Sequence, residues 1–109
     1  MKKETNDFIR KYLNPYKKLN LNCINHDSNT TKEHRELVNS VCNWATENGY
    51  DYLTRGVTKE GKIVDIIIPE LSRPLIEVRD SEKKKDKKYL TKYEDMIIFV
   101  DVDDPWRLL

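Results

Sequence analysis

The stretch KIVDIIIPELSRPLIEVRD, residues 62–80, decides the fold of this chain. It holds two short runs rich in Ile, Leu and Val, a composition typical of β-strands that are buried on both faces. The segment PELSRP (69–74) between them has a proline at each end, and proline lacks the N–H group that a strand interior needs. We therefore expect strands over residues 62–68 and 75–80, separated by a loop.

Two further strands are expected on either side of this stretch. Residues 50–55 follow a glycine and change from a helical to a strand-like period, and residues 57–61 are expected to turn. Residues 96–102 (MIIFVDV) form another apolar run of strand length. A weaker alternation at residues 19–23 is also strand-like.

Helical spacing marks residues 32–48, which we expect to form a helix that ends at Gly49. Three polar residues just before it are candidates for the N-terminal cap, namely Ser28, Asn29 and Thr30. The stripe of this helix that is expected to be buried consists of Leu37, Val38, Val41, Trp44 and Ala45, with His34 one turn earlier.

Two other segments have helical patterns. Residues 82–94 predict a basic helix, and residues 4–13 predict a short helix that ends where Asn14 precedes Pro15. The order of elements in the core is thus αβββαβ, which predicts an α/β fold with a mixed central sheet flanked by helices. We expect a single domain over residues 1–109, with its core at about 31–103 and an N-terminal extension at 1–30.

Length and composition agree with one folded domain. The chain has 109 residues, of which 38% are hydrophobic and 36% charged, so it is too apolar for a disordered protein. No apolar run approaches the length of a transmembrane helix, and the basic start lacks the apolar stretch of a signal peptide. We therefore expect no membrane partner and a cytoplasmic location. Cys23 and Cys42 are interpreted as free, largely buried thiols, although a bridge between them stays open.

Charge is segregated along the chain, although the net charge is only +1. Residues 1–20 carry six basic and two acidic side chains, and residues 81–92 have the same balance. The basic residues of the second segment are Lys83, Lys84, Lys85, Lys87, Lys88 and Lys92. Such segregation can produce a basic face for nucleic acid, and the alternative is a solvated helix surface.

Charged residues also interrupt the two central strands. Asp65 lies inside IVDIII, and Glu77 and Arg79 lie inside LIEVRD. A carboxylate buried in a strand is costly unless it is paired or binds a metal. If the two strands are neighbours, Asp65 and Glu77 can converge at one spot that suits Mg²⁺, with Arg79 two residues beyond. The other interpretation is a structural ion pair between Arg79 and one of these carboxylates.

Asp65, the sequence Glu77-Val78-Arg79 and the order of elements together resemble the PD-(D/E)XK, or restriction-endonuclease-like, nuclease superfamily. The resemblance covers about residues 31–103 and is greatest to small archaeal Holliday junction resolvases. It implies Mg²⁺ or Mn²⁺ held by Asp65, Glu77 and the backbone carbonyl of Val78. It also implies that the second-helix lysines, 83–92, contact the DNA backbone.

The chain departs from the motif at two positions. Arg79 stands where the motif has lysine, and arginine can stabilise charge but cannot act as a base. In the first helix, His34 occupies the position at which resolvase-like members have glutamate, and Glu33 is adjacent. Glu33 or His34 is therefore expected to complete the catalytic site.

The leading hypothesis is a metal-dependent DNA endonuclease that hydrolyses phosphodiester bonds, with branched or structured DNA among its substrates. Asp65 and Glu77 would bind the metal, and Arg79 would stabilise the charge of the phosphate. A homodimer is expected, because one site per chain cannot cut both strands at once. The alternative is a module of the same fold that binds nucleic acid or a protein partner without cleavage.

Overall fold

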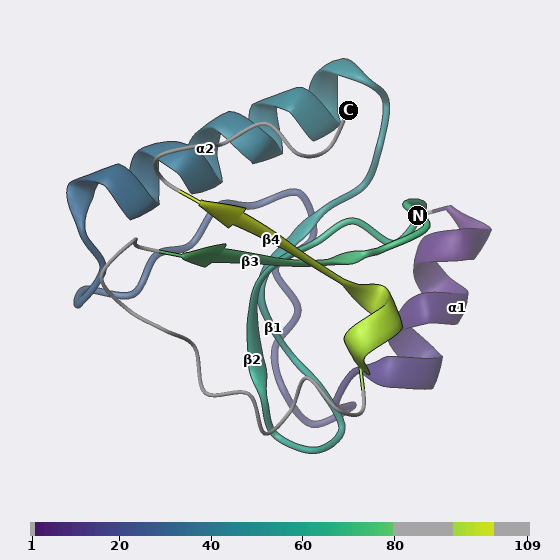
Figure 1. Cartoon of the computed structure of the whole chain (residues 1–109). Coiled ribbons are helices and arrows are strands. Elements are labelled where there is room, and N and C mark those ends of the chain that lie inside the picture. The colour runs from purple at the N-terminus through teal and green to yellow at the C-terminus, as the bar shows by residue number, and fades with distance from the viewer. Residues whose placement is uncertain (1, 80–92, 102–109) are drawn as a thin grey trace.

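The computed structural model describes residues 2–79 and 93–101 and has an α/β architecture built on a mixed four-stranded sheet (Figure 1). The elements in chain order are helices α1 (Lys3–Tyr12) and α2 (Lys32–Glu47), strands β1 (Leu53–Val57), β2 (Ile63–Ile67) and β3 (Leu75–Arg79), a 3-10 helix (Glu94–Met96) and strand β4 (Ile97–Asp101). The strands expected from residues 62–68, 75–80 and 96–102 are thus confirmed, each with shorter bounds. The strand expected over residues 50–55 forms but is shifted to Leu53–Val57, so it includes the first residue of the turn expected at 57–61.

The strands lie in the order β1-β2-β3-β4. β1, β2 and β3 form an antiparallel meander, and β4 runs parallel to β3. A parallel neighbour requires a crossover connection, and the chain between β3 and β4 is long enough for one. The helix predicted over 82–94 falls largely within residues 80–92, which lie outside the described residues, as do residues 102–109.

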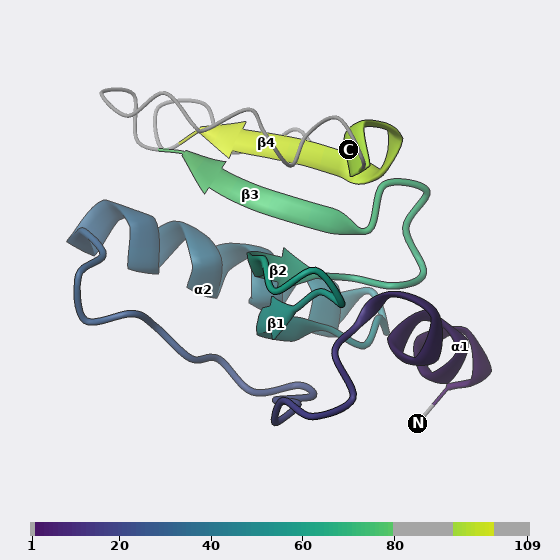
Figure 2. The same cartoon turned by 90° about the horizontal axis from the view of Figure 1, so that it is seen from below.

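Two apolar clusters fill the two faces of the sheet. α2 packs on one face, where its buried side chains meet Ile66, Ile76 and Val100. On the other face, Phe8 of α1 and the following Leu13 join the cluster around the remaining strand residues. Figure 2 shows α1 and α2 well apart from each other along the sheet. Burial on both faces explains the continuous apolar runs of β2 and β3.

The ends of α2 show how local chemistry sets its bounds. Its N-cap is Thr31, whose hydroxyl accepts the backbone N–H of His34, so the expected cap at residues 28–30 is wrong. Thr30 is instead part of a separate turn, in which its N–H and its hydroxyl both donate to the carbonyl of Asp27. At the other end, Gly49 has a φ of +74°, as a helix C-terminus often requires.

The stripe of α2 that faces the sheet is close to the expected one. Four of its five predicted members are buried, whereas Trp44 is only partly buried and packs against Tyr50 at 5.7 Å between ring centroids. Cys42 is fully buried, and burial raises the pKa of its thiol to about 12. Cys23 is exposed, which corrects the expectation that both thiols are buried.

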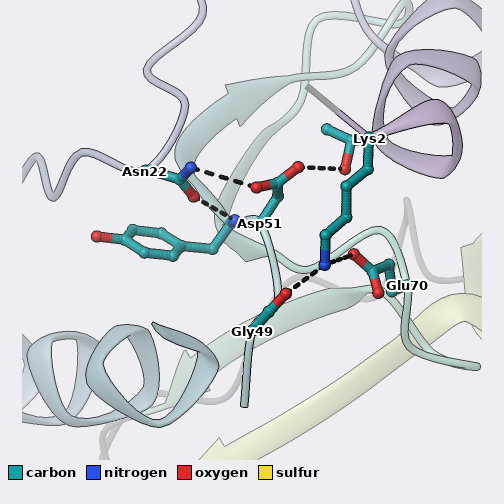
Figure 3. A network of polar contacts seen from close by, with 7 residues as sticks. Lys2, Asn22, Gly49, Asp51 and Glu70 are labelled. Atoms are coloured by element: carbon teal, nitrogen blue, oxygen red, sulfur yellow. Dashed lines mark hydrogen bonds and ion pairs between the residues drawn. The ribbon is translucent and has the colours of Figure 1, made fainter. Parts of the chain in front are cut away.

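Helix α1 forms at the expected position, and polar contacts join its N-terminal end to the segments just before β1 and just after β2 (Figure 3). Lys2 forms an ion pair with Glu70 at 2.7 Å, and the hydroxyl of Thr5 donates to Asp51 at 2.9 Å. The side-chain amide of Asn22 also donates to Asp51, at 3.3 Å. Burial opposes the charged form of Asp51, but these hydrogen bonds outweigh it and lower the pKa of its carboxyl.

The segment expected to be strand-like at residues 19–23 makes only a single β-bridge, Leu21 to Leu53. Asn22 has a φ of +54°, and its own backbone and side chain bond to the backbone of Tyr52. Neither α1 nor α2, the α-helices of the described part of the chain, combines the length and apolar composition needed to cross a bilayer.

Candidate functional site

The point at which β2 and β3 separate is occupied by Asp65. The two strands pair at Ile66 with Ile76 and at Ile67 with Leu75. One residue earlier on β2, the backbone N–H of Val78 donates to Oδ2 of Asp65 at 2.9 Å. The carboxylate thus takes the place of a backbone acceptor, and its charge strengthens the hydrogen bond.

The strands are irregular at this level. Val64 and Ile67 belong to the same apolar cluster although three positions separate them, which the alternation of a regular strand does not allow. On β1, Arg55 lies opposite Asp65 in the register and has a φ of +54°, a conformation uncommon for arginine. Asp65 lies at this irregular level of the sheet, and 21% of its side chain is exposed.

His34 lies beside Asp65. Its Nε2 atom is 3.6 Å from Oδ2 of Asp65, and only 12% of the histidine side chain is exposed. The Nδ1 atom of His34 is buried and has no hydrogen-bond partner among the described residues. The first turn of α2 fixes this arrangement, because the cap at Thr31 positions the backbone of His34. The sequence prediction that His34 belongs to the same neighbourhood as Asp65 agrees with this contact.

A small polar pocket adjoins this pair. Its volume of about 10 Å³ is that of a single water-sized sphere. An ion pair between Arg55 and Asp27, at 3.3 Å, lies at its wall. Its lining consists of Asn25, His26, Asp27, Thr30, His34, Val38, Arg55 and Asp65. The sequence analysis did not identify Asp27 or Arg55, because their approach depends on the loop before α2 and on the distortion of β1.

Glu77 is nearly fully buried, with 2% of its surface exposed. Strand alternation places its side chain on the face of Leu75, opposite to Val78 and to α2. Its neighbour on β4 is Phe99. Because Asp65 bonds to the amide that follows Glu77, the two carboxylate residues meet at the backbone of residues 77–78.

Arg79 forms its ion pair with β4, the neighbour of β3 on the side away from β2. Its Nε and Nη2 atoms donate to the two oxygens of Asp101 at 2.8 and 3.3 Å, and its guanidinium lies 4.6 Å from the ring centre of Phe99. The interpretation of Arg79 as an ion-pair partner named Glu77 or Asp65 as candidates, whereas the structure pairs it with Asp101. The parallel register of β3 and β4, which the tertiary structure sets, places residue 101 beside residue 79.

The remaining predicted site residues lie elsewhere. Glu33 is exposed in the first turn of α2. Lys83, Lys84, Lys85, Lys87, Lys88 and Lys92 lie outside the described residues. Within residues 2–79 and 93–101, no group of three or more His, Cys, Asp or Glu side chains is arranged to hold a metal ion.

Comparison with protein-family models, curated proteins and solved structures found no match to this chain.

Proposed function

We propose that this chain is a metal-dependent nuclease of the restriction-endonuclease-like type, which hydrolyses DNA phosphodiester bonds. The observation that carries the proposal is the hydrogen bond between Asp65 and the amide of Val78. It brings the first predicted metal ligand to the backbone of the other two, Glu77 and Val78, at the point where two strands separate. Beyond Ile66 and Ile76 the pairing of the two strands ends, so the backbone there has room to face a ligand.

The residues present suit a hard divalent cation. Mg²⁺ in proteins is commonly held by one or two carboxylates and completes its shell with water and substrate phosphate oxygens. Asp65 and Glu77 would supply the two carboxylates, and the carbonyl of Val78 would add a third oxygen. The proposal requires the Glu77 side chain to reach this gap from its own face of β3.

The protein side chains would divide the remaining work. When bound, the cation would offset the charge that develops on the phosphate. The imidazole of His34 lies 3.6 Å from Asp65, and a neutral imidazole can accept a proton from a water molecule in the adjoining pocket. Glu33, exposed at the start of α2, is the second candidate for this role. Two copies of the chain would be needed to cut both strands of a duplex or a junction.

A second candidate function is a module of the same type that binds nucleic acid or a protein partner without cleavage. The specific observation in its favour is the two-point ion pair between Arg79 and Asp101. A guanidinium engaged in this way is less available to a phosphate, and arginine cannot replace the motif lysine as a base. A binding module of this kind would have the same fold and would need no metal ion.

The experiment is a cleavage assay on supercoiled, linear, single-stranded and branched DNA with Mg²⁺, Mn²⁺ or EDTA. We expect metal-dependent cleavage by the wild type, and a loss of at least about 100-fold in Asp65→Asn and in Glu77→Gln. Glu36→Gln is the matched control, because Glu36 is an exposed carboxylate of α2 that forms an ion pair with Lys32 at 3.7 Å.

Calorimetric titration with Mn²⁺, together with thermal unfolding, separates loss of the site from loss of the fold. Asp65→Asn retains an oxygen that can accept from Val78, so the variant is expected to fold and to bind Mn²⁺ more weakly. A wild type that binds DNA but neither Mn²⁺ nor Mg²⁺, and cuts no DNA of the panel, would refute the nuclease and favour the binding module.

A further inference from the structure

The N-terminal segment and the turn between β1 and β2 lie side by side, although more than 40 residues separate them in the sequence (Figure 1). Leu13 forms a β-bridge with Thr58, and the backbone N–H of Lys59 donates to the carbonyl of Tyr12 at 2.9 Å. The N–H of Asn14 donates to Val57 at 2.8 Å. Two stretches that are each modestly basic therefore form one continuous surface.

This surface, which we call the Tyr16 surface, is strongly basic. It is formed by residues 10–18 and 58–62 and carries six exposed basic side chains, namely Arg10, Lys11, Lys17, Lys18, Lys59 and Lys62. None of the six forms an ion pair with another described residue. The acidic residue of these two stretches, Glu60, accepts a hydrogen bond from the hydroxyl of Tyr93. Unneutralised positive charge concentrated in this way attracts a polyanion.

An exposed aromatic ring lies among these charges. Tyr16 is 92% exposed, so its ring contributes almost nothing to the core. Its backbone is nevertheless held, because the side chain of Asn14 accepts the N–H of Tyr16 at 2.9 Å and Pro15 restricts the turn. Leu13, only 2% exposed, anchors the base of the turn in the core. The ring is therefore displayed from a rigid support, which lowers the entropic cost of binding.

We propose that the Tyr16 surface binds single-stranded nucleic acid, with the basic side chains on successive phosphates and the ring of Tyr16 stacked on an unpaired base. Lysine and arginine side chains that track a backbone, interleaved with an aromatic platform, are the recurring means of binding single strands. A duplex offers its phosphates but not the face of a base, so the exposed ring favours the single strand. This inference rests on the proposed function only in taking nucleic acid as the partner, and binding at the Tyr16 surface does not depend on cleavage.

The test is fluorescence anisotropy of the full chain with a labelled thymidine oligonucleotide of about 20 nucleotides, in EDTA so that no cleavage occurs. Tyr16→Ala is expected to bind about tenfold more weakly, whereas Tyr16→Phe keeps the stacking face and binds like the wild type. Lys17→Gln combined with Lys18→Gln is expected to reduce the slope of log affinity against log salt by about 1.4.

A control variant and a separate readout make the outcome specific. Lys32→Gln removes an exposed lysine of α2 and should leave the affinity unchanged. Cleavage by Asp65→Asn and oligonucleotide binding in EDTA by Tyr16→Ala are separate readouts, so a failed nuclease and a failed Tyr16 surface give different results. Wild-type affinity in Tyr16→Ala or in the double lysine variant would overturn the proposal. Tighter binding to the matching duplex, or to vesicles of anionic lipid, would overturn it as well.

Discussion

The centre of the sheet and the Tyr16 surface both carry charged side chains, but the two regions differ in whether those side chains have ion-pair or hydrogen-bond partners. In the sheet, Asp65 is bonded to the amide of Val78 and contacts His34, and Arg79 is paired with Asp101. On the Tyr16 surface, six basic side chains have no ion-pair partner among the described residues. Burial forces compensation, whereas solvent does not.

The difference shows what each kind of charge can reveal about function. A compensated charge in a sheet is compatible with the fold whether or not it also performs chemistry, so its presence alone does not separate the nuclease from a binding module. An exposed charge needs no partner for folding. Its clustering around a rigidly supported aromatic ring therefore says more about a ligand than about stability. Three predictions test how far this contrast holds.

The largest effect is expected where the Tyr16 surface joins the core. Leu13→Ala removes a side chain that is 2% exposed and should lower the free energy of unfolding by about 2–5 kcal/mol. Urea denaturation measures this loss. Leu19→Ala, at a residue that is 37% exposed, is the control and should change stability by no more than about 0.5 kcal/mol. A loss below about 1 kcal/mol in Leu13→Ala would show that Leu13 does not anchor the Tyr16 surface to the folded core.

A smaller effect is expected where α1 contacts Asp51. The carboxylate of Asp51 is compensated by hydrogen bonds from Thr5 and Asn22, as Asp65 is compensated in the sheet. Thr5→Val removes a hydrogen bond to Asp51 and should cost about 1 kcal/mol at neutral pH. Folding lowers the pKa of Asp51 below its ordinary value of 3.8, so its contribution is complete above pH 3.8 and is lost as the pH falls through the folded pKa.

Urea unfolding of the wild type and of Asp51→Asn across acidic pH tests that dependence. The difference between the two should be greatest at neutral pH and should shrink below pH 3.8. Asp7→Asn, at an exposed carboxylate of α1, serves as the control. A difference that does not change with pH would show that the Asp51 carboxylate is not stabilised by folding.

The smallest effect is expected for the pair that joins β3 and β4. The side chains of Arg79 and Asp101 are 38% and 28% exposed, so solvent screens their interaction. A double-mutant cycle with Arg79→Gln and Asp101→Asn should give a coupling energy of about 0.5–1 kcal/mol. A coupling near zero would leave Arg79 available to a phosphate, and one above about 2 kcal/mol would make it a structural residue.

Periodicity was sufficient to predict most elements of the fold. The stripe from Leu37 to Ala45 predicted α2, and the apolar runs around Asp65 and Glu77 predicted β2 and β3, because each pattern reports burial along one continuous segment. The cap of α2 was misplaced by one residue, because Thr30 and Thr31 have similar capping chemistry and the separate turn at Asp27 engages Thr30.

The candidate site was predictable only in part. An ionisable residue inside an apolar strand is visible in the sequence, and so Asp65, Glu77 and Arg79 could be identified. The partner of Arg79 could not, because its pairing with Asp101 follows from the parallel register of β3 and β4. His34 was expected beside Asp65 only through the family resemblance, and its approach to Asp65 follows from the packing of α2. The sequence also did not show that Lys59 and Lys62 lie beside the N-terminal basic residues, because that neighbourhood depends on contacts between segments far apart in the chain.

The sequence by itself determined the order of the elements, the residues that each turns inward and the positions at which charge enters the sheet. These properties depend on the period of side chains along a helix or strand, which is local. Tertiary structure decided which charges meet, where β2 and β3 separate around Asp65, and how two distant basic stretches form one surface. Those outcomes depend on register and on the packing of segments far apart in the chain, and no period along one segment records them.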